Sequence, residues 1–230
     1  AGGMLITKLP TPAEELVGNI KKVTNTKFLK GIEDVLNSLD LKTLKKLSEC
    51  QGFDKVLEDM TQYWTKFKGG KFQLEYAAKL IEDGKNVKFE VSKLSTAENR
   101  IYDIEATFVE NGRTITKHFE LKNWNGFYSS SIKNQFVTDL ASMENLGDVQ
   151  WVFNKTDNIS DISTLKTKVI GALKNADGTA VEALDKIPRD QVKKIVGEDF
   201  GIITEANKSK VLLKALEDES FFKKIFKIVE

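Results

Sequence analysis

The chain has few of the residues that build small disulfide-bonded or zinc-bound proteins. Its 230 residues contain one cysteine, Cys50, and one histidine, His118. A lone cysteine excludes an intrachain disulfide, and with a lone histidine it also excludes a zinc finger or a cysteine–histidine catalytic pair. We expect Cys50 to be a buried structural thiol. Long apolar runs are also missing, so no segment approaches the roughly 20 residues of a membrane-spanning helix.

A strong excess of one charge is missing as well. The chain has 35 lysines and arginines against 34 acidic residues, which gives a net charge of +1. This balance excludes a global attraction to nucleic acid or to anionic membranes, so any basic surface must be local. With 40% hydrophobic residues, the chain is long enough for one domain with additions or for two domains.

Local patterns predict three regions along the chain. We expect a helical N-terminal region at residues 1–68 and a core of helices and strands at residues 69–157. A helical C-terminal region at residues 158–230 is expected to pack on that core. The pair Gly69-Gly70 marks the first boundary, because adjacent glycines favour a break in a helical pattern.

The central region alternates between helical and strand patterns. A helix is expected from about residue 71 to Gly84, and residues 129–143 predict a second helix. Runs of β-branched and aromatic residues predict strands at residues 87–93, 100–110, 113–124 and 150–154. The order helix, three strands, helix, strand predicts an α/β (α+β) fold with a central mixed β-sheet flanked by helices.

A tight hairpin fixes the relation of two of these strands. Asn111-Gly112 lies between two runs in which apolar and polar residues alternate. Both residues of this pair readily adopt the positive φ that a two-residue hairpin turn needs. Counting outward from the turn, Glu105 faces His118 and Asp103 faces Glu120. Facing Cβ atoms lie roughly 5 Å apart, and two facing carboxylates destabilise a sheet unless a cation neutralises them.

The strand after the turn adds a lysine to this pair of acids. Side chains two residues apart in a strand share a face, so Lys122 is expected beside Glu120 and Asp103. Magnesium binds few protein carboxylates and keeps water or phosphate oxygens as further ligands. An ammonium near such an ion can orient a bound water and offset charge that develops on a phosphate.

The same acids could instead form the solvated side of the sheet, and alternating strands often do so. The coincidence of the carboxylates in the hairpin register and the amphipathic helices on both flanks favour a site. His118 and Glu105 are expected to pair with each other across the strands, and we assign Glu105 no firm role in binding a metal.

These residues resemble the PD-(D/E)xK, or restriction-endonuclease-like, nuclease superfamily. The resemblance covers residues 71–154, with the metal-binding aspartate of the family at Asp103 and its (D/E)xK pair at Glu120 and Lys122. Tyr102 stands where the family name has a proline. The resemblance implies a restriction-endonuclease-like core, a Mg²⁺ or Mn²⁺ cofactor held by Asp103 and Glu120, and hydrolysis of a phosphodiester.

Two further residues match the family pattern and complete the expected catalytic set. Glu75 corresponds to an acid on the first helix, and Gln135 to a glutamine on the helix after the strands. Each has an ordinary alternative: Glu75 could pair with Lys79 one turn later on an exposed helix face, and Gln135 could be a polar residue at the edge of a packed helix.

Aromatic and basic residues after the third strand are the expected contacts with substrate. Trp124, Tyr128 and Lys133 supply stacking groups and positive charge to the loop and helix that leave the catalytic strand. Lysine-rich helix faces are usually solvated surface, and an aromatic residue at a strand end often belongs to the core.

The function that these features predict is a metal-dependent nuclease acting on DNA or RNA, transfer RNA included. The architecture resembles C-terminal toxin domains of bacterial polymorphic or contact-dependent inhibition systems. That resemblance implies secretion within a larger bacterial protein, action in the cytoplasm of a target cell, and a cognate immunity protein. The alternatives are a restriction or repair endonuclease acting in its own cell, a non-catalytic helical binding module, and a nuclease-like fold that binds without cutting.

Overall fold

The computed structural model describes residues 9–93 and 99–230. The chain forms two compact units, residues 1–89 and residues 90–230. The boundary between the units falls after residue 89, and the C-terminal helices share one core with the strands of the second unit.

The first unit is helical, as the sequence predicts for its beginning. Its first helix begins at Pro12. The Thr11 side chain accepts a hydrogen bond from the Glu14 N–H, and the Glu14 carboxylate accepts one from the Thr11 N–H. Such a capping box satisfies two otherwise unpaired donors at the helix start. The helices of this unit are α1 (Pro12–Gly18), η1 (Thr26–Phe28), α2 (Leu29–Asn37), α3 (Leu41–Ser48), α4 (Phe53–Met60) and α5 (Trp64–Glu82).

The predicted helix break at Gly69-Gly70 is wrong. Both glycines lie inside α5, which runs without interruption from Trp64 to Glu82. A Cβ on Gly70 would lie 2.2 Å from Cγ of Met60, so glycine there permits close packing of α4 against α5. Gly70 therefore serves the contact between the two helices, and tertiary packing outweighs the unfavourable helix propensity of glycine at this position.

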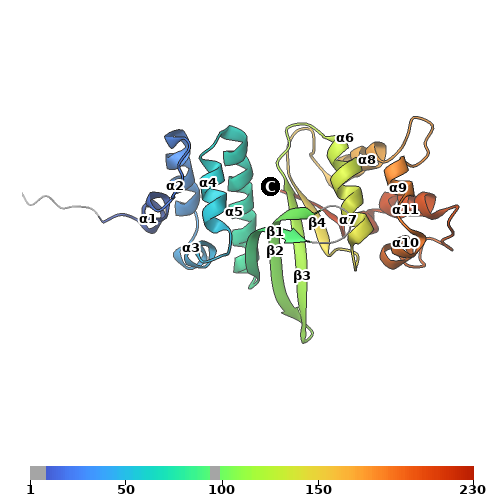
Figure 1. The fold of residues 1–230 in the computed structure, drawn as a ribbon, viewed down its shortest axis with the longest axis horizontal. Coiled ribbons are helices and arrows are strands. Elements are labelled where there is room, and N and C mark those ends of the chain that lie inside the picture. Colours follow the sequence, from blue (N-terminus) through green and yellow to red (C-terminus); the bar gives the residue numbers. More distant parts are fainter. Residues whose placement is uncertain (1–8, 94–98) are drawn as a thin grey trace, which may run out of the picture. The chain divides into compact units, whose positions relative to one another are not determined.

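A mixed five-stranded sheet is the second main element, with strand order β1-β2-β3-β4-β5. Its strands β1 to β4 are labelled in Figure 1. Strands β2 and β3 are antiparallel, whereas β3, β4 and β5 run parallel to one another. The strands are β1 (Asn86–Lys93), β2 (Arg100–Glu110), β3 (Arg113–Lys122), β4 (Val149–Asn154) and β5 (Phe226–Val229). The mixed sheet and its first four strands are confirmed, whereas β5 lies in a region predicted as helical throughout.

The hairpin between β2 and β3 follows the predicted register. Asn111 and Gly112 have φ values of 50° and 75°, as a two-residue turn with both residues at positive φ requires. Glu105 pairs with His118, and Glu110 pairs with Arg113. The turn chemistry and the alternation of the flanking residues therefore fix this part of the sheet.

The second unit packs its helices around a large apolar core. The helical stretch after β3 comprises α6 (Ser129–Ser131), a π-helical turn η2 (Ile132–Phe136) and α7 (Val137–Ser142). Phe136 and Leu140 on it share the core with Trp151 of β4 and Phe226 of β5. The remaining helices are α8 (Ile162–Ala172), α9 (Glu182–Asp185), α10 (Arg189–Val196), α11 (Lys208–Glu217) and α12 (Glu219–Phe222).

Two further expectations concern the thiol and the membrane. Cys50 is half-buried rather than fully buried, and burial together with the neighbouring Glu49 raises the pKa of its thiol. None of the helices in the described ranges has the length and apolar character that crossing a bilayer requires.

Candidate active site

Glu120 is a buried carboxylate that faces a cation on each oxygen. Regular alternation along β3 places its side chain on the same face as Lys122. Oε1 of Glu120 lies 3.3 Å from Nζ of Lys122, and Oε2 accepts a hydrogen bond of 2.5 Å from Nη2 of Arg100. Glu120 is only 6% exposed, so these two cations compensate much of the cost of burying its charge.

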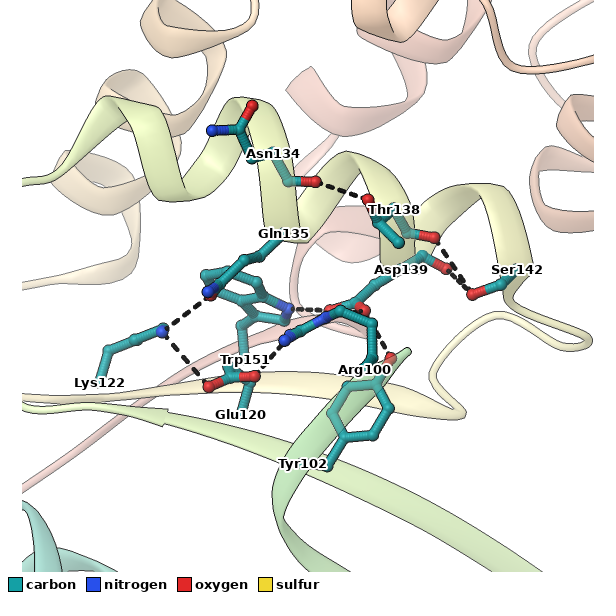
Figure 2. Close-up of polar contacts among 10 residues, drawn as sticks. All are labelled: Arg100, Tyr102, Glu120, Lys122, Asn134, Gln135, Thr138, Asp139, Ser142 and Trp151. Atoms are coloured by element: carbon teal, nitrogen blue, oxygen red, sulfur yellow. Dashed lines mark hydrogen bonds and ion pairs between the residues drawn. The ribbon is translucent and has the colours of Figure 1, made fainter. Parts of the chain in front are cut away.

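Gln135 meets Lys122. Nζ of Lys122 donates to Oε1 of Gln135 at 3.2 Å, from the π-helical turn η2 (Figure 2). The same ammonium lies 5.0 Å from the ring centroid of Trp151 and 5.5 Å from that of Trp124. A carboxylate, an amide and two aromatic faces thus hold the lysine in one place, since each of them attracts a cation.

Asp139 and Arg100 complete a polar network that the sequence analysis missed. Asp139 is fully buried and accepts hydrogen bonds from Arg100 Nε at 3.0 Å, Tyr102 Oη at 2.5 Å and Trp151 Nε1 at 2.8 Å (Figure 2). Burial raises the pKa of Asp139, and these hydrogen bonds oppose that rise. Asp139 lies four residues after Gln135 on the same helical stretch, and a charged residue among apolar neighbours was the available signal.

Arg100 joins the two acids of this network. Burial alone would lower its pKa, but hydrogen bonding and attraction from Asp139, followed by Glu120, outweigh burial, so the pKa of Arg100 is raised. Its guanidinium therefore stays charged and holds Glu120 and Asp139 at fixed positions. Arginine suits this role because its planar donors can serve two carboxylates at once.

Asp103 lies where the paired part of the hairpin ends. The ladder runs from Glu110–Arg113 to Ile104–Phe119, so the predicted Asp103–Glu120 pair falls beyond its last rung. Oδ2 of Asp103 accepts a hydrogen bond of 2.7 Å from the Leu121 N–H. The side chain therefore accepts from a main-chain donor of β3 at the point where the ladder stops.

The expected alternation of β2 is interrupted at the same point. In a regular strand Tyr102 would share a face with Ile104, but Tyr102 belongs to the core of Trp151 and reaches Asp139. Its ring centroid lies 5.0 Å from that of His118, whereas Ile104 pairs with Phe119. A regular strand would keep residues two apart on one face, so β2 is irregular around Asp103.

Asp103 and Glu120 remain electrostatically close despite this irregularity. Burial raises the pKa of Asp103 well above its ordinary value, and the charge of Glu120 raises it further. Glu90 of β1 adds to this effect and has a positive φ of 53°, which is uncommon for a residue other than glycine. Repulsion among these acids is the condition that a bound cation would relieve.

The donor set fits a hard divalent cation better than zinc. Within residues 9–93 and 99–230, no three or more histidine, cysteine or acidic side chains are arranged to hold a metal ion. Two carboxylates, from Asp103 and Glu120, suit an ion such as Mg²⁺ that takes few protein ligands. Glu120 would have to share its oxygens with Arg100 and Lys122.

Glu75 belongs to the first unit of the chain, whereas Glu120 and Lys122 belong to the second. It lies on α5, in residues 1–89, and its Oε1 is 3.8 Å from Nζ of Lys71, one turn earlier. The pairing partner is thus Lys71 rather than Lys79. A role for Glu75 in catalysis stays a prediction.

Of the three predicted substrate contacts, Trp124 lies near the lysine. Trp124 is half-buried and packs edge-to-face on Phe153 and on Tyr128, at centroid distances of 5.3 and 5.0 Å. Tyr128 is 53% exposed, and Lys133 is exposed on η2. Trp124 therefore helps to seat Lys122, while Tyr128 and Lys133 are the members of this group open to solvent.

The histidine is paired as predicted. Nε2 of His118 lies 2.9 Å from Oε2 of Glu105. Burial lowers the pKa of His118, although Glu105 opposes the change. Glu105 is therefore occupied as the partner of this histidine.

Comparison of the chain with protein-family models, with curated proteins and with solved structures finds no match.

Proposed function

We propose that the protein is a metal-dependent nuclease that hydrolyses phosphodiester bonds in DNA or RNA. The observation that carries the proposal is the contact chain from Glu120 through Lys122 to Gln135 beside Asp103. These residues lie on two strands and the following helix, in the order of the PD-(D/E)xK motif. We further propose that helix, strands and helix form a restriction-endonuclease-like core.

Each residue of this site has a definite task in the proposed reaction. Asp103 and Glu120 would hold Mg²⁺ or Mn²⁺, which supplies Lewis-acid activation of water and of the phosphate. Lys122 orients the attacking water and offsets the charge that develops on the phosphate, because its ammonium is held against Glu120. Gln135 is a positioning residue that fixes the ammonium, and Arg100 fixes the carboxylate of Glu120.

The direct test is a cleavage assay on two polymers. Purified protein is incubated with plasmid DNA and with total RNA, with Mg²⁺, with Mn²⁺ and with EDTA. We expect cleavage of at least one polymer that depends on the metal and is lost in Glu120→Gln and Lys122→Met. Lys117→Met, a change at a half-buried lysine of the same strand outside the proposed site, is the control and should cut normally.

A second candidate is a nuclease-like fold that binds nucleic acid without cutting. The observation that favours it is that both oxygens of Glu120 are already engaged, by Arg100 and by Lys122. Binding of oligonucleotides without cleavage under any of the metal conditions would select this alternative.

The biological role that we propose is a bacterial toxin domain neutralised by an immunity protein. Its support is the resemblance of a compact nuclease core with helical partners to such domains, and delivery within a larger secreted protein would follow from it. Expression in a bacterial host should then arrest growth, and Glu120→Gln should relieve the arrest. Absence of any effect of the active protein on the host would instead favour a restriction or repair enzyme.

A further inference from the structure

The helical unit carries a local basic surface. Residues 19–30 and 61–73 contain seven lysines and no acidic residue, in a chain whose net charge is +1. The two segments are joined by Thr24, whose N–H donates to Oγ1 of Thr61 at 3.1 Å and whose hydroxyl lies 3.0 Å from the Thr61 hydroxyl. Positive charge from two parts of the chain is therefore gathered in one area.

Several of these lysines are available to an external anion. Lys30 lies 2.8 Å from Asp34, and Lys71 lies 3.8 Å from Glu75, so these two have internal partners. Four of the seven lysines are exposed and form no ion pair with any residue in the described ranges: Lys21, Lys22, Lys27 and Lys66.

Exposed aromatic rings accompany these lysines. Trp64 is 60% exposed and Tyr63 is 53% exposed at the start of α5. The Trp64 ring stacks on that of Phe67, with centroids 5.7 Å apart and an interplanar angle of 23°, and Phe67 stacks in turn on Phe28 at 5.5 Å and 18°. The inner two rings are buried and the outer ring faces solvent, which leaves an aromatic surface on a packed base.

The base of this stack is held firmly against α2. A Cβ on Gly31 would lie 2.8 Å from Cζ of Phe67, so the phenyl ring rests directly on the α2 backbone. Nζ of Lys27 lies 5.7 Å from the Phe28 ring centroid, which fixes a cation beside the same stack. An exposed ring with a rigid base and neighbouring ammonium groups is the combination that single-stranded nucleic acids use, because bases stack while phosphates pair with lysine.

We propose that this surface of the helical unit binds single-stranded nucleic acid. Bases stack on Trp64 and Tyr63, and phosphates contact Lys27 and Lys66. Unpaired bases are required, because a duplex does not expose base faces to a protein ring. The inference needs no catalysis and goes beyond the proposed nuclease function, since it assigns a ligand to residues outside the proposed active site.

The test measures binding of the full-length protein to fluorescein-labelled single-stranded DNA and RNA oligonucleotides by anisotropy. EDTA is present throughout, so the result does not depend on cleavage. We expect Trp64→Ala to weaken binding about 5- to 150-fold, the factor that corresponds to about 1–3 kcal/mol for stacking of one base. Trp64→Phe keeps a ring on the stack and should recover most of the affinity.

The lysines are tested by salt dependence, with matched controls from α3. The double change Lys27→Gln and Lys66→Gln should reduce the slope of log affinity against log salt by about 1.4, since each contact with a single-stranded phosphate contributes about 0.7. The double change Lys42→Gln and Lys45→Gln, at exposed positions of the same unit, should leave it nearly unchanged. Leu41→Ala, at a residue 68% exposed, is the control for loss of apolar surface.

Three results would overturn the inference. The first is an absence of oligonucleotide binding at low salt. The second is unchanged affinity in Trp64→Ala with the circular dichroism spectrum of the parent. The third is binding to vesicles of anionic phospholipid that an excess of oligonucleotide does not displace, which would assign the surface to membranes.

Discussion

Replacement of Asp139 by alanine tests whether the buried network stabilises the second unit. The substitution removes the carboxylate that accepts from Arg100, Tyr102 and Trp151. It leaves a buried guanidinium with Glu120 as its remaining carboxylate partner in this network. Losing one partner of a buried charge pair costs about 3–5 kcal/mol, because the other charge stays desolvated and uncompensated.

The assay is chemical unfolding in urea, followed by tryptophan fluorescence. Because globular proteins are stable by only about 5–15 kcal/mol, the midpoint for Asp139→Ala should shift far below that of the parent protein. Asp190→Ala is the matched control, since Asp190 has a 90% exposed side chain and pairs with Arg189 at 3.8 Å. Exposed pairs of this kind contribute about 0–1 kcal/mol.

The comparison of Asp139→Ala with Asp190→Ala decides whether the buried network stabilises the second unit. A loss of less than about 1 kcal/mol in Asp139→Ala, similar to Asp190→Ala, would refute the view that the network compensates its own burial. Asp139→Asn should fall between the parent and the alanine variant, because an amide oxygen still accepts from Trp151 but carries no charge for Arg100.

Further outcomes follow from other contacts. Gly70→Ala should destabilise the helical unit by about 1–3 kcal/mol through overpacking against Met60, whereas Gly69→Ala, with open space around its Cβ position, should stabilise it by about 0.5–1 kcal/mol; equal urea midpoints would contradict this. The pKa of His118, read from its imidazole proton resonances, should lie below its ordinary value of 6.5. Because the folded state then binds fewer protons, stability should rise with pH from the folded pKa up to about 6.5 and change little above it; a pKa above 6.5 would be inconsistent with burial as the dominant cause.

Local sequence patterns were sufficient for the hairpin and for part of the site. Asn111-Gly112 fixes the turn, and from the turn the pairing of Glu105 with His118 follows by counting. Alternation along β3 also places Glu120 beside Lys122. These features depend on neighbours in the chain, which is why periodicity and turn chemistry capture them.

The features that were missed depend on contacts between distant residues. Arg100 and Asp139 are 39 positions apart, so no local pattern links them. The interruption of β2 at Asp103 follows from the hydrogen bond of its side chain with the Leu121 N–H, which a simple count of residues from the turn does not anticipate. β5 is a short strand of four residues that depends on pairing with β4, and such strands carry little signal of their own.

The most direct test of the central claim, that Asp103 and Glu120 hold a divalent cation, is calorimetric titration of the protein with Mn²⁺ at neutral pH. The parent protein should bind about one ion, and Asp103→Asn and Glu120→Gln should each abolish or greatly weaken that binding while the fold is retained. Glu110→Gln, in an exposed part of the same hairpin, should bind as the parent does. Binding of Mn²⁺ that is unaltered in both site variants, or no binding by the parent protein, would contradict the account.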